Sequence, residues 1–310
     1  MTMAALPPRR RESPDGGAAG ADVASRTTVL LFLLPAALVL VVVFALPILQ
    51  TVYYSFTDWR GGMRPANFVG LSNYAKALQS ERVLSALTHN VTLLLVIPVE
   101  IVLAVIAASG LRERVYGWRV YCFLLLVPSI ISITIAGYAW TYFLSPQGIV
   151  NIILREIGLG SITRAWLGDE TFALICVMGL LVWRDTGFAA VLFYSRLLAV
   201  DESIYEAAAL DRANRWHRLI HIDFPLLKNV IILFSVLMSV WIFSFVFNYV
   251  YVMTGGGPGT ASTVAELEIF REGFWQSRPG YASAISLILL VITLPLIALQ
   301  IHLQVRRKAR

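Results

Sequence analysis

The segment EAAALDRANRWHRLIHIDFPLLKN, residues 206–229, stands out because it carries many charged side chains inside a chain that is otherwise mostly apolar. Hydrophobic residues make up 58% of the 310 residues and charged residues only 14%, and the mean hydropathy is +0.72. Soluble domains have about 45–50% apolar and about 25% charged residues. The composition therefore indicates a membrane protein in which residues 206–229 form a polar connection between apolar segments.

Six apolar stretches are long enough to cross a bilayer, which needs about 20 mostly apolar residues per helix. They are residues 29–52, 87–111, 120–144, 172–195, 230–253 and 282–305. The first stretch exceeds the about 7–15 apolar residues of a secretory signal, so we interpret it as a retained helix. We predict an all-α integral membrane protein with one six-span domain over residues 29–305.

Basic residues near the span ends predict the orientation, because they are retained on the cytoplasmic side. They are more frequent at both chain termini and in the connections after the second and fourth spans than in the remaining connections. We therefore expect both termini in the cytoplasm, with residues 1–28 as a disordered basic tail and residues 306–310 as a basic C-terminus. This topology also explains the net charge of +6 without nucleic acid.

Residues 206–229 then lie on the cytoplasmic face, within a connection of about residues 198–228. Ser203 and Glu206 have the spacing of a capping box, which predicts a helix start. Pro225 predicts a break near Asp223–Phe224, because proline disfavours helix at the preceding residue. Between these points we expect one helix with a single apolar stripe, formed by Ala209, Ala213, Trp216 and Ile220.

The order of residues in this connection resembles the EAA loop of membrane subunits of binding-protein-dependent ATP-binding-cassette importers. The resemblance implies a coupling helix seated in a groove of a separate ATPase subunit. The residues that it assigns to this coupling loop are Glu206, Ala207, Ala208, Asp211, Arg212, Ala213, Ile222 and Pro225.

Four further segments resemble the sugar-importer branch of that family, the maltose-type and glycerol-3-phosphate-type permeases. They are FVGLSNY at 68–74, SPQG at 145–148 with Asn151, YVMTGGGPGT at 251–260 and GYASA at 280–284. The resemblance implies a bacterial plasma (inner) membrane permease for a sugar or related polyol, or alternatively for a non-sugar solute such as glycerol-3-phosphate. The implied partners are a second homologous permease, two ATPase subunits and an extracytoplasmic substrate-binding protein.

Two positions depart from the family pattern. Arg212 stands where the family usually has Gly, and Asn229 stands where it usually has Pro. A positive φ costs a residue such as Arg about 1–2 kcal/mol, whereas Gly adopts it freely. The bend in the loop is therefore expected to form differently here, with Asn214 as an alternative turn residue.

No motif in the sequence predicts catalysis or a resident cofactor. The run Gly255–Gly259 lacks the Lys-Ser or Lys-Thr of a nucleotide-binding loop, so we expect it to form a turn and ATP hydrolysis to belong to partner subunits. His217 and His221 lack a Cys or carboxylate at metal-ligand spacing, and no metal site is predicted. A polytopic membrane enzyme and a self-sufficient secondary transporter remain as alternatives, and copurification of an ATPase subunit would discriminate between them and an importer.

Two groups of span residues are candidates for function. Trp241, Phe245, Asn248 and Tyr249 share one helical face and suit a sugar, which packs on aromatic rings and needs polar partners, although such residues also pack helices together. The intramembrane charges are Glu100, Arg184 and Asp185. Charges at membrane depth usually face a partner or a wet cavity, and similar depth favours a pair between Glu100 and Arg184, with Asp185 as the rival partner.

Overall fold

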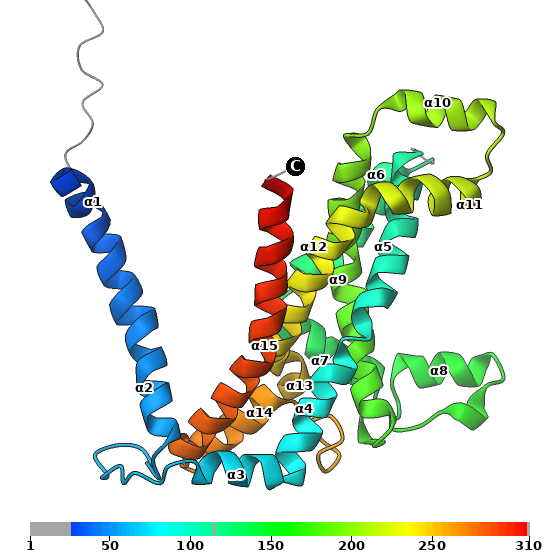
Figure 1. The fold of residues 1–310 in the computed structure, drawn as a ribbon. Coiled ribbons are helices and arrows are strands. Elements are labelled where there is room, and N and C mark those ends of the chain that lie inside the picture. The colour runs from blue at the N-terminus through cyan, green and yellow to red at the C-terminus, as the bar shows by residue number, and fades with distance from the viewer. Residues whose placement is uncertain (1–25, 114–115, 309–310) are drawn as a thin grey trace, which may run out of the picture. The chain divides into compact units, whose positions relative to one another are not determined.

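The computed structural model describes residues 26–113 and 116–308 and is drawn in Figure 1. These residues form helices, turns and loops with one isolated β-bridge and no named strand, which confirms the all-α prediction. The chain divides into one unit up to Gln50 and a second from Thr51 onward. Most of the predicted N-terminal tail lies outside the described residues; its last residues, 26–28, are helical.

The first predicted span is a continuous helical run, formed by α1 (Arg26–Val39), a π-helical segment η1 (Leu40–Ala45) and α2 (Leu46–Ser55). Its apolar part, Leu31–Ser55, is long enough to cross a membrane. The prediction of a retained apolar helix over residues 29–52 agrees with this run.

Four further helical runs of the described chain are long and apolar enough to be spans. The second predicted span begins earlier than expected, at α4 (Glu81–Leu93), and continues through α5 (Val96–Arg112). Pro98 has no amide hydrogen to bond the Leu94 carbonyl, which explains the irregular turn between α4 and α5. The remaining runs are α9 (Phe172–Leu198), the run Arg215–Phe245 and the apolar part of α15 (Pro279–Lys308).

The third predicted span is not the single straight helix expected over residues 120–144. It consists of α6 (Trp118–Ile130) and α7 (Ile133–Phe143), whose axes differ by 99°. Pro128 weakens the last turn of α6 by removing a helical hydrogen bond, and Ile131 is extended with ψ of 136°. The described residues therefore contain five helical runs long and apolar enough to cross a membrane, or six if this bent pair counts as one span.

Small residues let the central helices approach closely. α9 packs on both α5 and α6, and a Cβ at Gly187 of α9 would lie 1.6 Å from the Leu125 carbonyl oxygen of α6. Ala104, Ala108 and Ala190 are fully buried in the same core. Interfaces of this kind are typical of membrane helices, where close backbone packing replaces the hydrophobic effect.

Short helices cover one end of the bundle. Among them are α3 (Ser72–Gln79), α13 (Phe247–Met253), α14 (Ala265–Phe270) and the π-helical η5 (Arg271–Trp275). Within the second unit, α3 and α14 lie at the end opposite to α10 (Glu202–Leu210) and α11 (Arg215–Arg218), as Figure 1 shows. We call the α3–α14 side the outer end, because the positive-inside pattern predicts that it faces out.

Two buried asparagines organise the loops of this end. Asn73 of α3 donates its amide to the carbonyls of Ser55 and Thr57, at 2.9 and 2.8 Å. Asn151 belongs to α8 (Ile149–Glu156) and bonds the backbone of a loop with the short 3₁₀ segments η2 (Gly160–Ile162) and η3 (Trp166–Gly168). The conspicuous asparagines of the 68–74 and 145–151 motifs therefore satisfy buried backbone groups.

Candidate functional site

The connection between α9 and α12 (Phe224–Phe245) forms a helical hairpin over residues 201–223, named here the α10–α11 hairpin. Its first helix is not capped by the predicted Ser203–Glu206 box. Asp201 is the N-cap, and its carboxylate accepts a hydrogen bond of 3.0 Å from the Ser203 amide. This bond lowers the pKa of Asp201, so the carboxylate remains charged at the positive end of α10. Ser203 follows Asp201 by two residues, so it lies in the first turn of α10 and does not occupy the N-cap position.

The predicted single helix with one apolar stripe is wrong, because the chain turns between α10 and α11. Arg212 itself adopts the left-handed conformation, with φ of 52°, at the position where the family usually has Gly. The Ala213 amide then donates to the Ala208 carbonyl at 2.9 Å and closes the turn. Asn214 is extended and caps α11 by accepting from the His217 amide, so it is a cap residue and not the left-handed turn residue.

The predicted helix break at Asp223–Phe224 is also wrong. The helix runs unbroken from Arg215 to Phe245, through the π-helical segment η4 (Leu219–Asp223). In this wider turn the Phe224 amide bonds the Leu219 carbonyl, five residues back. The altered pattern accommodates Pro225 in the first turn of α12, where its missing amide hydrogen is tolerated.

Polar contacts join the two arms of the hairpin and tie it to the end of α5. The Tyr205 hydroxyl donates to Asp223 at 2.7 Å, and burial together with this bond raises the pKa of Tyr205. The Arg112 guanidinium lies 3.2 Å from the centroid of the Tyr205 ring. Glu113, at the end of α5, pairs with both Arg215 and Arg218 of α11. The hairpin is therefore held by the end of α5, and its second arm continues without a break into α12.

A recess of about 420 Å³ lies between the two arms of the hairpin. It brings together six of the predicted coupling residues, Ala207, Ala208, Asp211, Arg212, Ala213 and Ile222. Glu206 and Pro225 do not line it, and both are exposed. Ala208 is only 7% exposed, so its small size serves the closure of the hairpin.

The predicted ion pair between Glu100 and Arg184 is not formed. Arg184 pairs instead with its neighbour Asp185, at 2.8 Å, and also donates to the Tyr249 hydroxyl at 3.0 Å. Adjacent helical residues point about 100° apart, but the long arginine side chain bridges that angle. Glu100 is fully buried, and neither of its carboxylate oxygens has a hydrogen-bond partner.

The four predicted substrate-path residues lie in different surroundings, because the helix is interrupted at Val246 between α12 and α13. Trp241 and Phe245 stack on α12 with ring centroids 4.5 Å apart, and Phe245 is 52% exposed. Asn248 is exposed on α13. Tyr249 is fully buried and bonded to Arg184, so it contributes to packing within the bundle.

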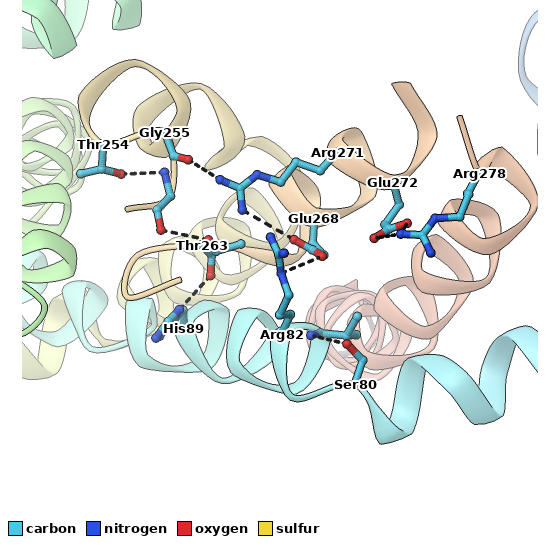
Figure 2. A network of polar contacts seen from close by, with 12 residues as sticks. Ser80, Arg82, His89, Thr254, Gly255, Thr263, Glu268, Arg271, Glu272 and Arg278 are labelled. Atoms are coloured by element: carbon cyan, nitrogen blue, oxygen red, sulfur yellow. Dashed lines mark hydrogen bonds and ion pairs between the residues drawn. The ribbon is translucent and has the colours of Figure 1, made fainter. Parts of the chain in front are cut away.

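A polar network at the outer end joins α4 to the segment after α13, as Figure 2 shows. The buried Glu268 pairs with Arg82 at 3.5 Å and with Arg271 at 3.8 Å. Arg271 also donates to the Gly255 carbonyl at 2.7 Å. The predicted turn at 255–259 is confirmed, with Gly255 in the left-handed region. Sequence reasoning did not select Glu268, although a carboxylate between basic residues in an outer segment was the available signal.

Comparison with known proteins identifies the family. Residues 100–309 match the family model described as binding-protein-dependent transport system inner membrane component. The chain belongs to this family. It is a multi-pass permease component of an inner membrane, in agreement with the resemblance found in the sequence.

Curated permeases match most of the chain. The probable ABC transporter permease protein YurN of Bacillus subtilis is 33% identical, over 85% of this permease and 91% of the relative. The trehalose/maltose transport system permease protein MalF of Thermococcus litoralis is 31% identical, over 83% and 86%. The sn-glycerol-3-phosphate transport system permease protein UgpA of Agrobacterium fabrum is 29% identical, over 87% and 92%.

The permease also has the fold of a solved transporter chain. A chain in the crystal structure of a bacterial ABC transporter involved in the import of the acidic polysaccharide alginate superposes with a TM-score of 0.77. The two chains are 23% identical, and the match covers 90% of this permease and 95% of the other chain. This likeness confirms the fold of an importer permease.

Proposed function

We propose that this chain forms part of the translocation path for a sugar or related polyol in an ATP-driven importer, and couples that path to separate ATPase subunits through the α10–α11 hairpin. The observation that carries the coupling proposal is the hairpin itself. It projects from the bundle at the predicted cytoplasmic end, yet Arg112 and Glu113 tie it to the end of α5 and its second arm runs without a break into α12. A force applied to the hairpin is therefore passed directly to predicted spans.

The proposed assembly contains a second homologous permease, two ATPase subunits and an extracytoplasmic substrate-binding protein. Two facts support it: the family is defined by dependence on a binding protein, and a related alginate transporter structure includes a periplasmic protein. ATP hydrolysis is assigned to the partner subunits, because the turn at 255–259 lacks the lysine of a phosphate-binding loop.

The saccharide assignment rests on relatives named for trehalose and maltose, multiple sugars and diacetylchitobiose. The stacked, partly exposed rings of Trp241 and Phe245 offer the flat apolar surface on which a sugar ring packs, and the exposed Asn248 offers an amide for its hydroxyls. A second candidate solute is glycerol-3-phosphate, because UgpA matches over a similar length.

Reconstitution tests the proposal. The permease is purified with its copurifying ATPase and permease subunits, placed in proteoliposomes, and supplied with the binding protein from the same source. ATP-dependent uptake of radiolabelled maltose, trehalose and glycerol-3-phosphate is then measured. Uptake of a saccharide confirms the substrate class, uptake of glycerol-3-phosphate alone selects the second candidate, and absence of any copurifying ATPase contradicts the coupling role.

Charge reversal in the hairpin tests the coupling assignment. Glu206 is exposed and makes no contact that holds the hairpin together, so Glu206→Arg changes the docking surface and not the fold. We expect a loss of bound ATPase and at least about a tenfold fall in uptake. Glu156→Arg, an exposed charge reversal on α8 at a distance from the hairpin, is the control and is expected to retain both. Normal ATPase binding and uptake by Glu206→Arg would exclude Glu206 from the interface.

A further inference from the structure

The start of α14 is held against α4 and α12 by one fully buried amide. The Oδ1 atom of Asn90, on α4, accepts a hydrogen bond of 2.8 Å from the Ala265 amide. Its Nδ2 atom donates to the Ile242 carbonyl of α12 at 3.4 Å and to Oε2 of Glu266 at 3.0 Å. Asn90 thus uses both hydrogens and the oxygen of its amide to join three helices.

The neighbouring residue of α4 holds the same segment. The Nδ1 atom of His89 lies 2.8 Å from the Thr263 carbonyl oxygen, as Figure 2 shows. Because a carbonyl oxygen only accepts, this nitrogen carries the hydrogen of the bond. Thr263 is fully buried, and its hydroxyl donates to the Gly256 carbonyl at 2.9 Å. The bonds of His89 and Asn90 to residues 263–266 are named here the α4–α14 contact.

Glu266 is the incompletely bonded member of this contact. Its Oε1 atom is buried without a hydrogen-bond partner, and the carboxylate belongs to none of the ion pairs of the described chain. Asn90 has no further hydrogen to donate to it. A buried ionised carboxylate with so few partners costs more free energy than the neutral carboxyl. Burial therefore raises the pKa of Glu266 from 4.5 to about 7, although the bond from Asn90 opposes this shift.

The other charged groups around Glu266 are engaged elsewhere. On α4 they are His89, which is bound to a carbonyl, and Arg82, which pairs with Glu268. Arg271, at the start of η5, also pairs with Glu268. The helix α13 carries no charged or histidine side chain, and those of the described parts of α12 and α15 lie at the ends far from α14. No cation of these elements is therefore paired with the Glu266 carboxylate.

We propose that Glu266 makes the α4–α14 contact sensitive to pH: the contact is closed while the carboxyl is protonated, and its ionisation releases the start of α14 from α4 and α12. The geometry supports this role, because one orphaned carboxylate oxygen lies beside the amide that joins the three helices. Since α14 belongs to the outer end, the pH of the outer compartment would control how readily this end rearranges. The inference depends neither on the identity of the solute nor on the coupling role of the hairpin.

The raised pKa fixes the direction of the pH effect. Where α14 has separated from α4, water reaches the Glu266 carboxyl and its pKa returns to the ordinary value of 4.5. Below that pH the carboxyl is protonated in both arrangements, and the contact has its full stability. As the pH rises from 4.5 to about 7, the separated arrangement ionises first and the contact weakens. The loss is complete above about pH 7.

The test measures amide hydrogen exchange of residues 262–270, which include the bonded Ala265 amide. The full-length permease is placed in nanodiscs with the subunits that copurify, and exchange is followed by mass spectrometry at about pH 5.5 and about pH 8. Glu266→Gln is measured in parallel, because glutamine keeps the size and the acceptor for Asn90 but cannot ionise. The intrinsic rate of exchange is the same in both proteins at each pH. The ratio of the wild-type rate to the Glu266→Gln rate should rise at least about tenfold from the lower to the higher pH.

Two controls separate Glu266 from other titrating groups. Glu156→Gln removes an exposed carboxylate of α8, and the ratio of the wild-type rate to its rate should stay within about twofold at both pH values. His89 is the rival group, because histidine changes charge between about pH 5 and 8. His89→Gln should exchange faster at both pH values, yet its rate relative to the double variant His89→Gln, Glu266→Gln should still rise with pH. Unchanged exchange over α5 and α9 verifies the folding of each variant.

Three results would overturn the proposal. A ratio of wild-type to Glu266→Gln rates that stays constant or falls with pH would exclude Glu266 as the sensitive group. A rise that disappears in His89→Gln would assign the effect to the histidine. An equal rise over residues 149–156 of α8 would show a general loosening of the chain. If Glu266→Gln does not assemble, the wild type decides alone, through the exchange of residues 262–270 relative to that of residues 149–156 at the two pH values.

Discussion

Arg184, Asp185 and Tyr249 form one connected polar group inside the bundle, and each member depends on the others. The arginine is 16% exposed and the aspartate 12%, so both charges are largely withdrawn from solvent. Removal of one charge from such a pair leaves the other uncompensated, which costs about 3–5 kcal/mol. Glu100 differs, because it has no hydrogen-bond partner to lose.

We therefore predict strong coupling between positions 184 and 185. Arg184→Gln and Asp185→Asn should each lower the thermal stability and the yield of assembled importer, and the double variant should recover at least about 1 kcal/mol of the summed loss. Glu100→Gln should be tolerated, because it preserves shape and breaks no bond. The measurement is the Tm of the purified complex for all four variants. Strictly additive losses would show that the ion pair contributes no net coupling.

Arg212 adopts a backbone conformation that residues with a side chain disfavour. Its φ of 52° costs about 1–2 kcal/mol for a residue with a side chain, and Gly would adopt the same turn without strain. Arg212→Gly should leave the Tm unchanged or raise it slightly, because relief of strain is partly offset by the greater entropy of Gly in the unfolded chain. Arg212→Val should lower it, since β-branched residues tolerate this region worst. Equal Tm values for the Gly and Val variants would contradict the strained turn.

At the scale of elements, apolar length predicted the existence of the helices well, while bends and caps were predicted poorly. A run of about 20 apolar residues has few alternatives to a helix in a bilayer, because every backbone group must bond internally. Pro225 and Pro128 each favour a helix break, yet the helix continues through Pro225, whereas the chain bends after Pro128. The difference comes from η4 and from packing on α9, which local sequence does not encode.

In the candidate site, too, the sequence predicted which segment is involved better than it predicted the contacts between side chains. The residue order indicated the coupling loop, and six of its eight assigned residues meet in one recess. The predicted pair between Glu100 and Arg184 was wrong, because equal depth along two helices does not determine which faces of those helices meet. The sequence did not predict the ion pair between Arg82 and Glu268, because these residues are far apart in sequence. The folding of the segment after α13 brings them together.

The crossing of α6 over α9 provides an element-scale prediction. Gly187→Ala would place a Cβ 1.6 Å from the Leu125 carbonyl oxygen, and helix backbones separate only by disturbing their packing. We expect a loss of about 1–3 kcal/mol, observed as a lower Tm of the purified complex. Gly110→Ala is the matched control, because a Cβ there meets nothing within 4 Å and alanine favours helix by about 0.5–1 kcal/mol. A Gly187→Ala protein as stable as wild type would show that α6 can move away without cost.

At the scale of the whole molecule, the α10–α11 hairpin and the polar network of Arg82 and Glu268 lie at opposite ends of the second unit. The long helices α5, α9 and α12 run between these two ends. Arg112 and Glu113 at the end of α5 tie the hairpin to the bundle, and the buried Asn73 holds the loop between α2 and α3. This arrangement agrees with a permease that transmits movement between an ATPase and a binding protein.

The bent pair α6–α7 decides the topology, because the two ends of the unit face opposite compartments only if this pair crosses the membrane once. Single cysteines at Tyr116 and Ser161, both exposed and on either side of the pair, test the crossing in a background where Cys122 and Cys176 are alanine. A membrane-impermeant maleimide should label Ser161→Cys in cells whose plasma membrane is intact and whose outer membrane or cell wall has been made permeable. Tyr116→Cys should be labelled only after lysis, because basic residues beside it retain that connection in the cytoplasm. Labelling of both positions from one side would make α6–α7 a re-entrant hairpin, and reversed labelling would place the α10–α11 hairpin on the outer face of the membrane.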